Sequence, residues 1–317
     1  MQTVLITGAE GFVGSHLLPH LRKKGYEVVA GVRNRARKLI YERQGVHALV
    51  CDVTDAINVA RVIASVRPDG VVHLAGMARP ADAADDPLLA YQSIVTAWAN
   101  VLDAVRRTVP RARVLLVSAA DVYGPAGEEP VRETTPPRPA TTFGSLKQAA
   151  EAIAATFYRD YHLNLTVARP FAYTGAGQPA GFYFGAVARQ LAECEPNGGT
   201  PELWLPDLDG RRDVLHVQDV VTAYQRLPED GRPNETYNVC SGQAVAYREL
   251  VTNMAGECGR SVELRELPAQ AAKARWASVI GDNTKLREEL GWTPERTAAQ
   301  AVRELMAGMR VRAESAA

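Results

Sequence analysis

Cysteine is scarce in this sequence, and its few copies lie far apart. The four cysteines are Cys51, Cys194, Cys240 and Cys258, and no two of them form a Cys-x-x-Cys pair. That spacing argues against both a zinc site and a disulfide framework. We therefore expect no bound metal, and the low cysteine content is typical of a reducing, cytoplasmic compartment.

An excess of one charge and long hydrophobic runs are also missing. Lysine plus arginine equals aspartate plus glutamate at 36 each, so no overall field favours nucleic acid or an anionic membrane as a partner. The N-terminal run "TVLITGAEGFVG" is interrupted by glycines and has no basic segment before it, unlike a signal peptide. No stretch approaches the roughly 18 apolar residues of a membrane span. These absences predict a soluble protein that binds neither membrane nor nucleic acid.

What the sequence does have is a regular alternation of two patterns. β-Branched runs alternate with segments such as "GSLKQAAEAIAATFYRDY", whose apolar residues recur at helical spacing. The expected strands lie at 3–6, 27–32, 47–53, 70–76, 113–119 and 164–170. Six or seven strands alternating with helices predict an α/β fold, a doubly wound parallel (Rossmann) sheet whose ligand lies at the carboxyl ends of the strands.

The alternation loosens after Pro170 into loops rich in glycine and proline. We predict a dinucleotide-binding Rossmann domain over residues 1–172, with a returning segment at about 214–240. A smaller α/β substrate-binding domain is expected to comprise residues 173–213 and 241–317.

Gly8, Gly11 and Gly14 form the motif G-x-x-G-x-x-G between the first expected strand and the first expected helix. Glycines at such positions let the backbone turn tightly and approach a pyrophosphate, and the helix N-terminus attracts the phosphate charge. A tight turn without a ligand is the alternative. The setting between strand and helix favours a dinucleotide site.

Arg33 stands at the end of the second expected strand, where an acidic residue would bind the adenosine ribose of NAD. Arginine there suits the 2'-phosphate of NADP instead, so we predict NADP(H), with NAD(H) as the alternative cofactor. A solvated basic loop is the other interpretation of this segment. Asp52 is expected near the adenine, or else as a cap of the following helix.

Eight segments together resemble the extended short-chain dehydrogenase/reductases, the family of nucleotide-sugar epimerases, dehydratases and reductases. They follow the family's order and spacing along nearly the whole chain: "TGAEGFVGSHL", "DGVVHLAG", "VSAADVYG", "FGSLKQAAE", "ARPFAYTGAGQ", "RRDVLHVQDVV", "YNVCSGQ" and "LGWTPE". Within this family the chain looks most like the GDP-6-deoxy-4-keto-hexose reductases that form GDP-rhamnose. The resemblance implies a nucleotide-diphosphate sugar as substrate.

The resemblance also implies a catalytic set of serine or threonine, tyrosine and lysine. These positions are Ala119, Phe143 and Lys147 here, so only the lysine is present. The missing tyrosine would exchange a proton with the sugar oxygen, and the missing serine would hydrogen-bond the same oxygen. General acid-base catalysis contributes about 10² to 10⁴ in rate, or roughly 3 to 5 kcal/mol. The chain as it stands is therefore expected to be nearly inert in hydride transfer.

The remaining site residues follow from the same resemblance. Around the cofactor it implies Phe12, Val13, Val53, Leu74, Ala75, Gly76, Val117 and Pro170, and around the nucleotide sugar it implies Arg79, Ala120, Asp121, Ala172 and Arg212. Arg212 is expected to contact the nucleotide, or else to form a structural ion pair with Asp213 or Asp219. Ala172, Ile94 and the pair Ala97-Trp98 depart from the family's usual residues, which leaves the identity of the sugar open.

Substitutes for the missing proton donor are few. Ser118 should point to the opposite side of an extended segment, and Tyr123 is expected to be structural. Asp121 qualifies as a base only if it points into the cleft. His73 and His216 are expected to be packing residues rather than acids.

Three interpretations remain open. The chain is a 4-position reductase or epimerase from which both hydroxyls were removed by engineering, a natural noncatalytic dinucleotide sensor, or an atypical dehydratase or epimerase with another acid or base. In each case the resemblance implies a homodimer, in which the helix of residues 91–105 and the helix after Phe143 pack against their copies. Trp98 is expected to belong to that surface.

Overall fold

Seven parallel strands form the central sheet of the computed structural model, which describes residues 2–127, 129–193, 200, 202–205, 207–208, 210–259, 261–267 and 279–316. Cys194 lies outside these residues. The strand order is β10-β6-β5-β4-β1-β2-β3. The strands are β1 (Thr3–Thr7), β2 (Glu27–Val32), β3 (Ala48–Val50), β4 (Gly70–His73), β5 (Arg113–Val117), β6 (Leu165–Pro170) and β10 (Thr236–Val239). The predicted doubly wound α/β fold is confirmed.

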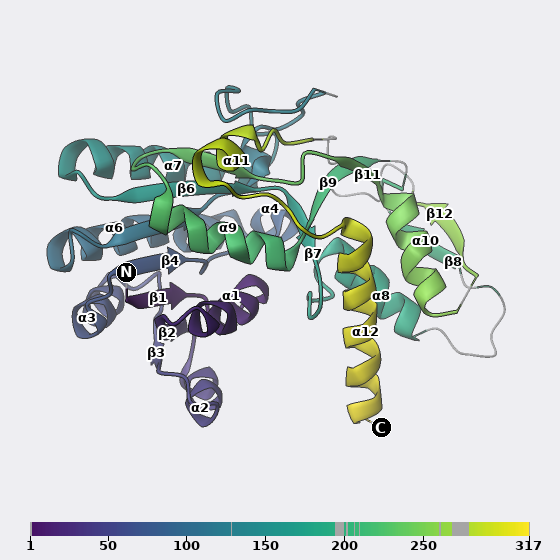
Figure 1. Ribbon diagram of the computed structural model, residues 1–317, viewed down its shortest axis with the longest axis horizontal. Coiled ribbons are helices and arrows are strands. Elements are labelled where there is room, and N and C mark those ends of the chain that lie inside the picture. Colours follow the sequence, from purple (N-terminus) through teal and green to yellow (C-terminus); the bar gives the residue numbers. More distant parts are fainter. Residues whose placement is uncertain are drawn as a thin grey trace.

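Helices cover both faces of this sheet because successive strand residues point to opposite sides. In β1, Leu5 packs into one core, while Val4 and Ile6 pack into the other. The first core takes most of its helical residues from α3 (Ala56–Val66), α6 (Ala97–Thr108) and α7 (Thr142–Tyr161). The second core takes them from α1 (Phe12–Lys23), α9 (Val217–Asp230) and α11 (Thr284–Leu290), as Figure 1 shows in front of the sheet. The continuous apolar strands of the sequence are explained by this burial on both faces.

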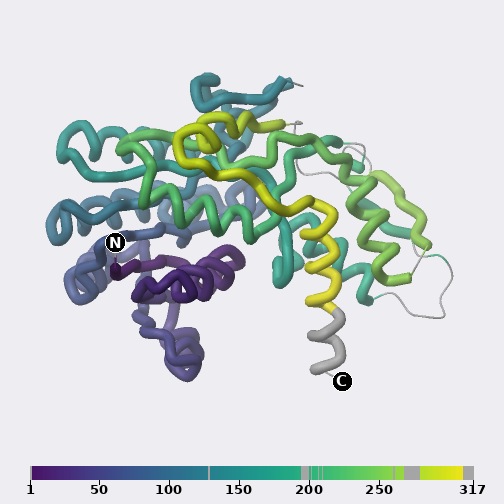
Figure 2. Tube along the Cα trace, viewed as in Figure 1, coloured from purple at the N-terminus to yellow at the C-terminus, as the bar shows by residue number. Residues whose placement is uncertain are grey.

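A second unit lies at the right of Figure 1, beside the end of the sheet strands. It contains a three-stranded sheet in the order β11-β9-β7 and a parallel pair of β8 and β12. Its elements are β7 (Ala172–Thr174), α8 (Tyr183–Glu193), β8 (Glu202–Leu205), β9 (Arg211–His216), β11 (Ala244–Ala246), α10 (Tyr247–Glu257), β12 (Glu263–Glu266) and α12 (Ala298–Ala316). α8, α10 and α12 contribute to a separate hydrophobic core. Between β9 and β11 the chain runs back along the first unit, which can be followed in green in Figure 2.

One part of the predicted division differs from the structure. The segment 241–317 is assigned to the second unit by the sequence, yet Leu286 and Leu290 of α11 and the following Trp292 pack into the core of the first. The reason is the indole of Trp292, whose Nε1–H donates to Thr222 Oγ1 on α9 at 2.9 Å. The other boundaries stay a prediction.

The helix predicted over 91–108 is not one regular α-helix. Residues Pro87–Tyr91 form α5, Gln92–Thr96 form the wide π turn η1, and α6 follows. η1 lies against the loop after β4, since a Cβ added at Gly76 would stand 2.7 Å from Ser93 O. π turns of this kind are frequent at functional sites.

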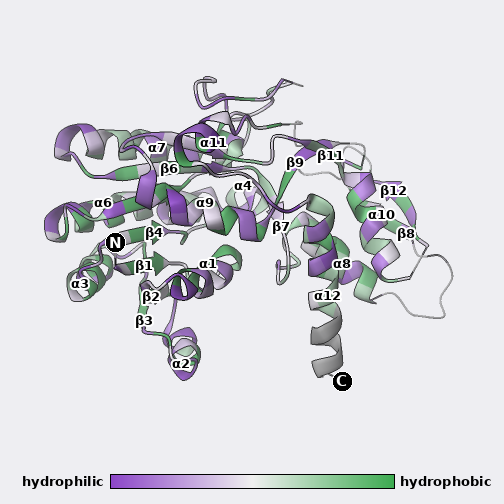
Figure 3. Ribbon diagram, in the orientation of Figure 1, coloured by the Kyte–Doolittle hydropathy of each residue, from purple (hydrophilic) through white to green (hydrophobic). Residues whose placement is uncertain are grey.

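Hydropathy follows these layers. Strands of the central sheet are largely hydrophobic in Figure 3, whereas α2 (Arg35–Arg43) is mainly hydrophilic and buries none of its residues. Cys51 and Cys240 are buried and form no disulfide. Within the described ranges, no helix combines the length and the apolar character that crossing a bilayer requires. Those ranges also hold no group of three histidine, cysteine or acidic side chains placed to bind a metal ion.

Candidate active site

The glycine motif forms a tight loop between β1 and α1. Gly8 has φ +70°, and a Cβ added there would lie 2.7 Å from Ala75 N in the loop after β4. A Cβ at Gly14 would lie 2.6 Å from the carbonyl oxygens of Gly8 and Ala9. Any side chain at these positions would push the loops apart, so glycine is required by close approach. The loop thus brings the expected residues after β1 and β4 together.

The start of α1 fits a phosphate group. Gly11 is its N-cap, and no side chain caps the helix, so the first-turn N–H groups of Phe12 and Val13 have no side-chain partner. Phe12 stacks on Tyr173 of β7, with ring centroids 6.1 Å apart. Exposed N–H groups at a helix N-terminus attract anions, and this helix begins at the carboxyl edge of the sheet.

Arg33 follows β2 and extends into solvent, with a side chain that is 84% exposed. Its Nε lies 3.3 Å from Glu10 Oε1, and Arg37 Nε lies 3.6 Å from Glu10 Oε2. Glu10 is therefore an acidic residue beside the expected adenosine ribose that the sequence interpretation missed. Glu10 comes from the glycine loop, whereas an acidic residue that binds the ribose is expected at the end of β2.

Asp52 does not cap α3, contrary to one sequence expectation. The cap is Asp55, whose Oδ1 accepts from Ile57 N at 2.9 Å. Asp52 instead accepts from Thr54 N and Thr54 Oγ1 in the turn after β3, at 3.0 and 2.7 Å. Asp52 is exposed just after the carboxyl end of β3, and its place near an adenine stays a prediction.

The side chain of Lys147 is buried among largely apolar groups. Its Nζ donates to Val117 O at 2.8 Å and lies 5.6 Å from the ring centroid of Phe143 and 5.8 Å from that of Trp98. Burial lowers the pKa of this ammonium to about 8. Both rings can interact with the ammonium through their π faces. Neither carries an acidic group that could donate a proton to a substrate.

Ala119 and Phe143 lie in the same core cluster as Trp98, and they are 7% and 4% exposed. Trp98 itself is 1% exposed, so the expectation that it belongs to an outer dimer surface is wrong. The ring turns inward because it packs against Lys147 and edge-on against His73, 6.5 Å away. Lys147 and Phe143 are thus brought together at the end of β5, two residues before Ala119, with Trp98 as an aromatic neighbour that was not foreseen.

Asp121 is a carboxyl group whose charge interacts with that of Lys147. It lies in the short turn η2 (Ala120–Val122), directly under the start of α7, since a Cβ at Gly144 would lie 2.5 Å from Asp121 O. The side chain is half-buried. Burial raises its pKa to about 6, although the positive charges of Lys147 and Arg212 act in the opposite direction. A carboxyl group with this pKa can donate or accept a proton near neutral pH.

The other potential acids have structural roles. His73 is buried, shares a hydrogen bond of 2.7 Å with Thr7 Oγ1 through Nδ1, and has a pKa lowered by burial to about 3. Tyr123 donates to Asn238 Oδ1 at 2.7 Å and accepts from Arg169 Nη1 at 3.0 Å. These contacts agree with the predicted packing role of His73 and structural role of Tyr123.

His216 and Ser118 also give no support for proton transfer. His216 accepts from Gln218 N at 3.0 Å, and its Nε2 lies 3.0 Å from Glu304 Oε2 on α12. Ser118 is buried, and its Oγ has no hydrogen-bond partner among the residues described. His216 therefore joins α9 to α12, and Ser118 packs behind β5.

Arg212 lies on β9 of the second unit and is largely buried. It pairs with Asp207 and lies 5.8 Å from the ring centroid of Tyr247. The alternative partners predicted for it are engaged elsewhere: Asp213 accepts from Ser241 N at 2.7 Å, and Asp219 binds Arg296 Nη1 at 2.6 Å. Neither Asp207 nor Tyr247 is predicted by the sequence: Asp207 lies only five residues before Arg212, whereas Tyr247, the first residue of α10, is brought to Arg212 by the fold.

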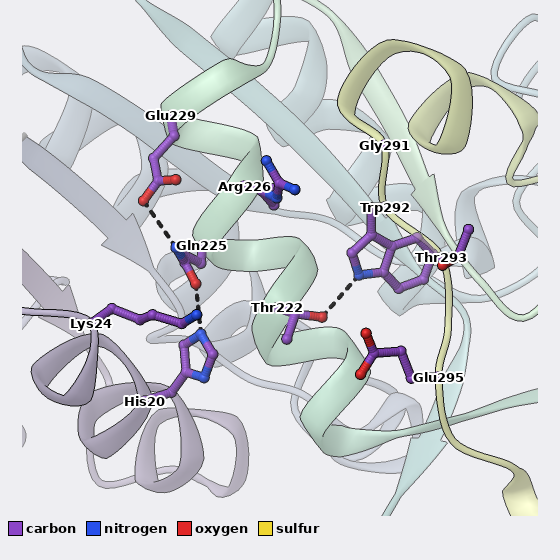
Figure 4. Close-up of a pocket in the computed structure, with 10 residues that line it drawn as sticks. All are labelled: His20, Lys24, Thr222, Gln225, Arg226, Glu229, Gly291, Trp292, Thr293 and Glu295. Atoms are coloured by element: carbon purple, nitrogen blue, oxygen red, sulfur yellow. Dashed lines mark hydrogen bonds between the residues drawn. The ribbon is translucent and has the colours of Figure 1, made fainter.

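A separate cavity of about 290 Å³ lies across α9, between the end of α1 and the segment after α11 (Figure 4). Several polar groups on it pair with each other, including His20 Nε2 with Gln225 Oε1 at 2.7 Å and Trp292 Nε1 with Thr222 Oγ1 at 2.9 Å. None of the predicted site residues lines it. The cavity is therefore distinct from the site that the predicted residues form at the carboxyl ends of the strands.

The fold and the site together define an extended short-chain dehydrogenase/reductase. Residues 5–305 match the family described as GDP-mannose 4,6 dehydratase, and the chain belongs to that family. It is 32% identical to a GDP-6-deoxy-D-mannose reductase of Pseudomonas aeruginosa, over 96% of each chain. It is 30% identical to a dTDP-6-deoxy-L-talose 4-dehydrogenase (NAD(P)(+)) of Kitasatospora kifunensis, over 95% of this chain and 94% of that one.

Solved structures agree with this placement. The chain is similar to RMD from Pseudomonas aeruginosa complexed with NADPH, with a TM-score of 0.86 and 29% identity over 98% of this chain and 100% of that one. It is also similar to a UDP-glucose 4-epimerase of Thermus thermophilus in complex with NAD, with a TM-score of 0.86 and 26% identity over 98% and 99% of the two chains. The nucleotide-sugar reductases, epimerases and dehydratases are thus the class of enzyme to which this chain is related.

Proposed function

We propose that the chain is a cytoplasmic nucleotide-sugar oxidoreductase of the 4-keto reductase or 4-epimerase type, in a form that lacks both proton-handling hydroxyls. The observation that carries this proposal is the position of Lys147, whose ammonium lies against Val117 O, Phe143 and Trp98 at the carboxyl edge of the sheet. The reductase from Pseudomonas aeruginosa and its NADPH complex support the same assignment.

The residues fit a nicotinamide dinucleotide. Gly8 and Gly14 form a cradle that a Cβ would fill, and the uncapped start of α1 presents N–H groups to a pyrophosphate. Lys147 would hold the nicotinamide ribose, with Val117 and Pro170 beside it. When bound, the cofactor supplies or accepts hydride. Its adenosine end would lie between Arg33 and Asp52.

The nucleotide sugar would occupy the space between the two units. Arg212 is held by Asp207 and would contact the nucleotide diphosphate, Arg79 would face the same nucleotide sugar, and Ala120 and Ala172 would border its hexose. Phe143 and Ala119 would face the sugar oxygen at which tyrosine and serine normally act. The bound pair should therefore be oriented for hydride transfer, without a group to exchange the proton quickly.

Two other functions are each favoured by one observation. The rings of Trp98 and Phe143 beside Lys147 favour a dinucleotide sensor, because these side chains can contact a ligand without reacting with it. Asp121 favours an atypical dehydratase or epimerase, because its pKa of about 6 suits acid-base chemistry. The activity of the chain with NADPH and a 4-keto nucleotide sugar tests the atypical enzyme, and the activity of the variant with Ala119→Ser and Phe143→Tyr separates the proposed oxidoreductase from the sensor.

The cofactor preference gives a first prediction. The chain should bind NADPH more tightly than NADH, and Arg33→Ala should reduce that preference about tenfold, because one charge-assisted contact to the 2'-phosphate is lost. Calorimetric titration measures both affinities. Arg43→Ala, at the far end of α2, serves as the matched control and should leave the ratio unchanged. Tighter binding of NADH, supported by Glu10 beside the ribose, would contradict the prediction.

A homodimer is also proposed, on a surface that differs from the sequence expectation. The apolar residues of α6 are mostly buried, whereas Leu88, Leu89 and Tyr91 of α5 are 68%, 48% and 48% exposed. α5 lies beside α7, whose Leu146 and Ile153 are partly buried. An apolar surface on these neighbouring helices is suited to pack against its own copy.

Light scattering at micromolar concentration should therefore give a dimer mass. Leu88→Asp should shift it to the monomer, because a charge would be buried in the interface without a partner. Ile57→Asp is the matched control, since Ile57 is 71% exposed but belongs to α3. A monomer mass for the unmodified chain would rule the dimer out.

A further inference from the structure

Arg79 reaches from the first unit to the backbone of the second. It follows β4 as the N-cap of α4 (Pro80–Asp85), and its side chain lies against Gly181, just before α8. A Cβ added at Gly181 would stand 2.1 Å from Arg79 Nη1, 2.9 Å from Cζ and 3.2 Å from Cδ. The guanidinium therefore occupies the space that any side chain at position 181 would need.

Asp82 fixes the orientation of this guanidinium. Its Oδ2 accepts from Arg79 Nε at 2.7 Å, and its Oδ1 lies 2.6 Å from Nη2. Two parallel bonds from a planar fork hold the plane of the group as well as its position. These bonds use two of the five N–H donors of arginine, and the side chain is still 41% exposed. Arg79 is thus oriented by the protein and still accessible to a ligand.

The segment that leads to Gly181 is anchored independently. His16 Nε2 lies 2.8 Å from Ala176 O, and Gln218 Nε2 lies 2.9 Å from His16 Nδ1. A neutral imidazole with its proton on Nε2 satisfies both bonds, donating to the carbonyl and accepting from the amide. Gln178 adds a bond from Nε2 to Tyr173 O at 2.8 Å. Because this segment is held, a methyl group at position 181 should displace the mobile end of Arg79 rather than the loop.

We propose that Arg79, packed against Gly181, binds a phosphate of the nucleotide diphosphate. Gly181 determines the affinity for this ligand because any side chain at position 181 would displace the guanidinium. The inference rests on the proposed function, because it requires a nucleotide sugar in the cleft. Ligands of parallel α/β sheets bind beyond the carboxyl ends of the strands, where the loop after β4 places Arg79. The guanidinium fork matches two phosphate oxygens at once.

Calorimetric titration with GDP tests the proposal in four variants. Arg79→Gln and Gly181→Ala should each weaken GDP binding about 10- to 100-fold, as expected for loss of hydrogen bonds to a charged group. The double variant should bind GDP no more weakly than Arg79→Gln alone, because both changes remove the same contact. Gly256→Ala is the matched control: Gly256 is an exposed helical glycine with no atom within 4 Å of an added Cβ. It should bind GDP like the unmodified chain.

NADPH affinity distinguishes the proposed contact from a general folding defect. A folding defect would weaken NADPH binding, whereas loss of the contact between Arg79 and the phosphate would not. The dissociation constant for NADPH should stay within about twofold of that of the unmodified chain in every variant. Unchanged GDP binding by Arg79→Gln or by Gly181→Ala would overturn the inference, as would a parallel loss of NADPH binding. If the unmodified chain bound none of GDP, UDP and dTDP, the proposed function would fail as well. If it bound any of them and the variants did so equally, only the role of Arg79 would fail.

Discussion

The paired substitution Ala119→Ser with Phe143→Tyr should raise the rate of NADPH oxidation with a 4-keto nucleotide sugar by about 10² to 10⁴. The tyrosine restores a proton donor to the sugar oxygen, and the serine restores a hydrogen bond to the same atom. Lys147 is already in place to lower the pKa of the new tyrosine, because its ammonium lies 5.6 Å from the centroid of that ring. Stopped-flow absorbance of NADPH measures the rate directly.

The single substitutions separate the two hydroxyls. Phe143→Tyr alone should recover more activity than Ala119→Ser alone, because tyrosine carries the proton and serine only orients the oxygen. The two gains should not multiply as independent effects, because both groups act on one oxygen. Phe157→Tyr, on the same helix, is the matched control and should leave the rate unchanged. A paired variant that binds both ligands yet stays inert would favour the sensor interpretation.

The slow turnover that the unmodified chain retains should fall about tenfold for each pH unit above about 6. Burial raises the pKa of Asp121 to about 6, so its protonated, proton-donating form is the major species below that pH and disappears above it. Asp121→Asn should lower the residual rate and flatten its pH dependence. Single-turnover rates between pH 5 and about 8, with saturating ligands, provide this measurement.

The paired variant with tyrosine and serine supplies the control for this pH dependence. Its proton would come from tyrosine, so the decline above about pH 6 should be absent, since that decline reflects the protonation of Asp121. A residual rate that rises with pH in the unmodified chain would show that the Asp121 carboxylate acts as a base instead. That result would favour the epimerase or dehydratase interpretation.

The parts of the structure that depend on local patterns could be predicted from the sequence. The seven-stranded sheet follows from β-branched runs buried on both faces, and the glycine motif is required by contacts between neighbouring loops. Lys147 was placed correctly relative to Phe143 because the two residues are one helical turn apart. These features need only the periods of helices and strands and the order of the motifs.

The parts that depend on distant contacts were missed. Trp98 has the helical position of a surface residue in the predicted dimer, but the π turn just before it and the space beside Lys147 turn it inward. Glu10 of the glycine loop pairs with Arg33, which follows β2, and no motif in the sequence predicts this pair. α11 joins the first core through contacts that include the indole of Trp292, which a division at residue 241 cannot anticipate.

The most direct test of the account is the turnover of the unmodified chain with NADPH and a 4-keto GDP-6-deoxyhexose, measured alongside the binding of both ligands. We expect that both ligands bind and that turnover stays far below about 1 per second, the lower end of ordinary enzyme rates. Turnover at about 1 per second or faster would contradict this expectation. That result would show that another group supplies the proton, and that Phe143 does not mark a missing acid.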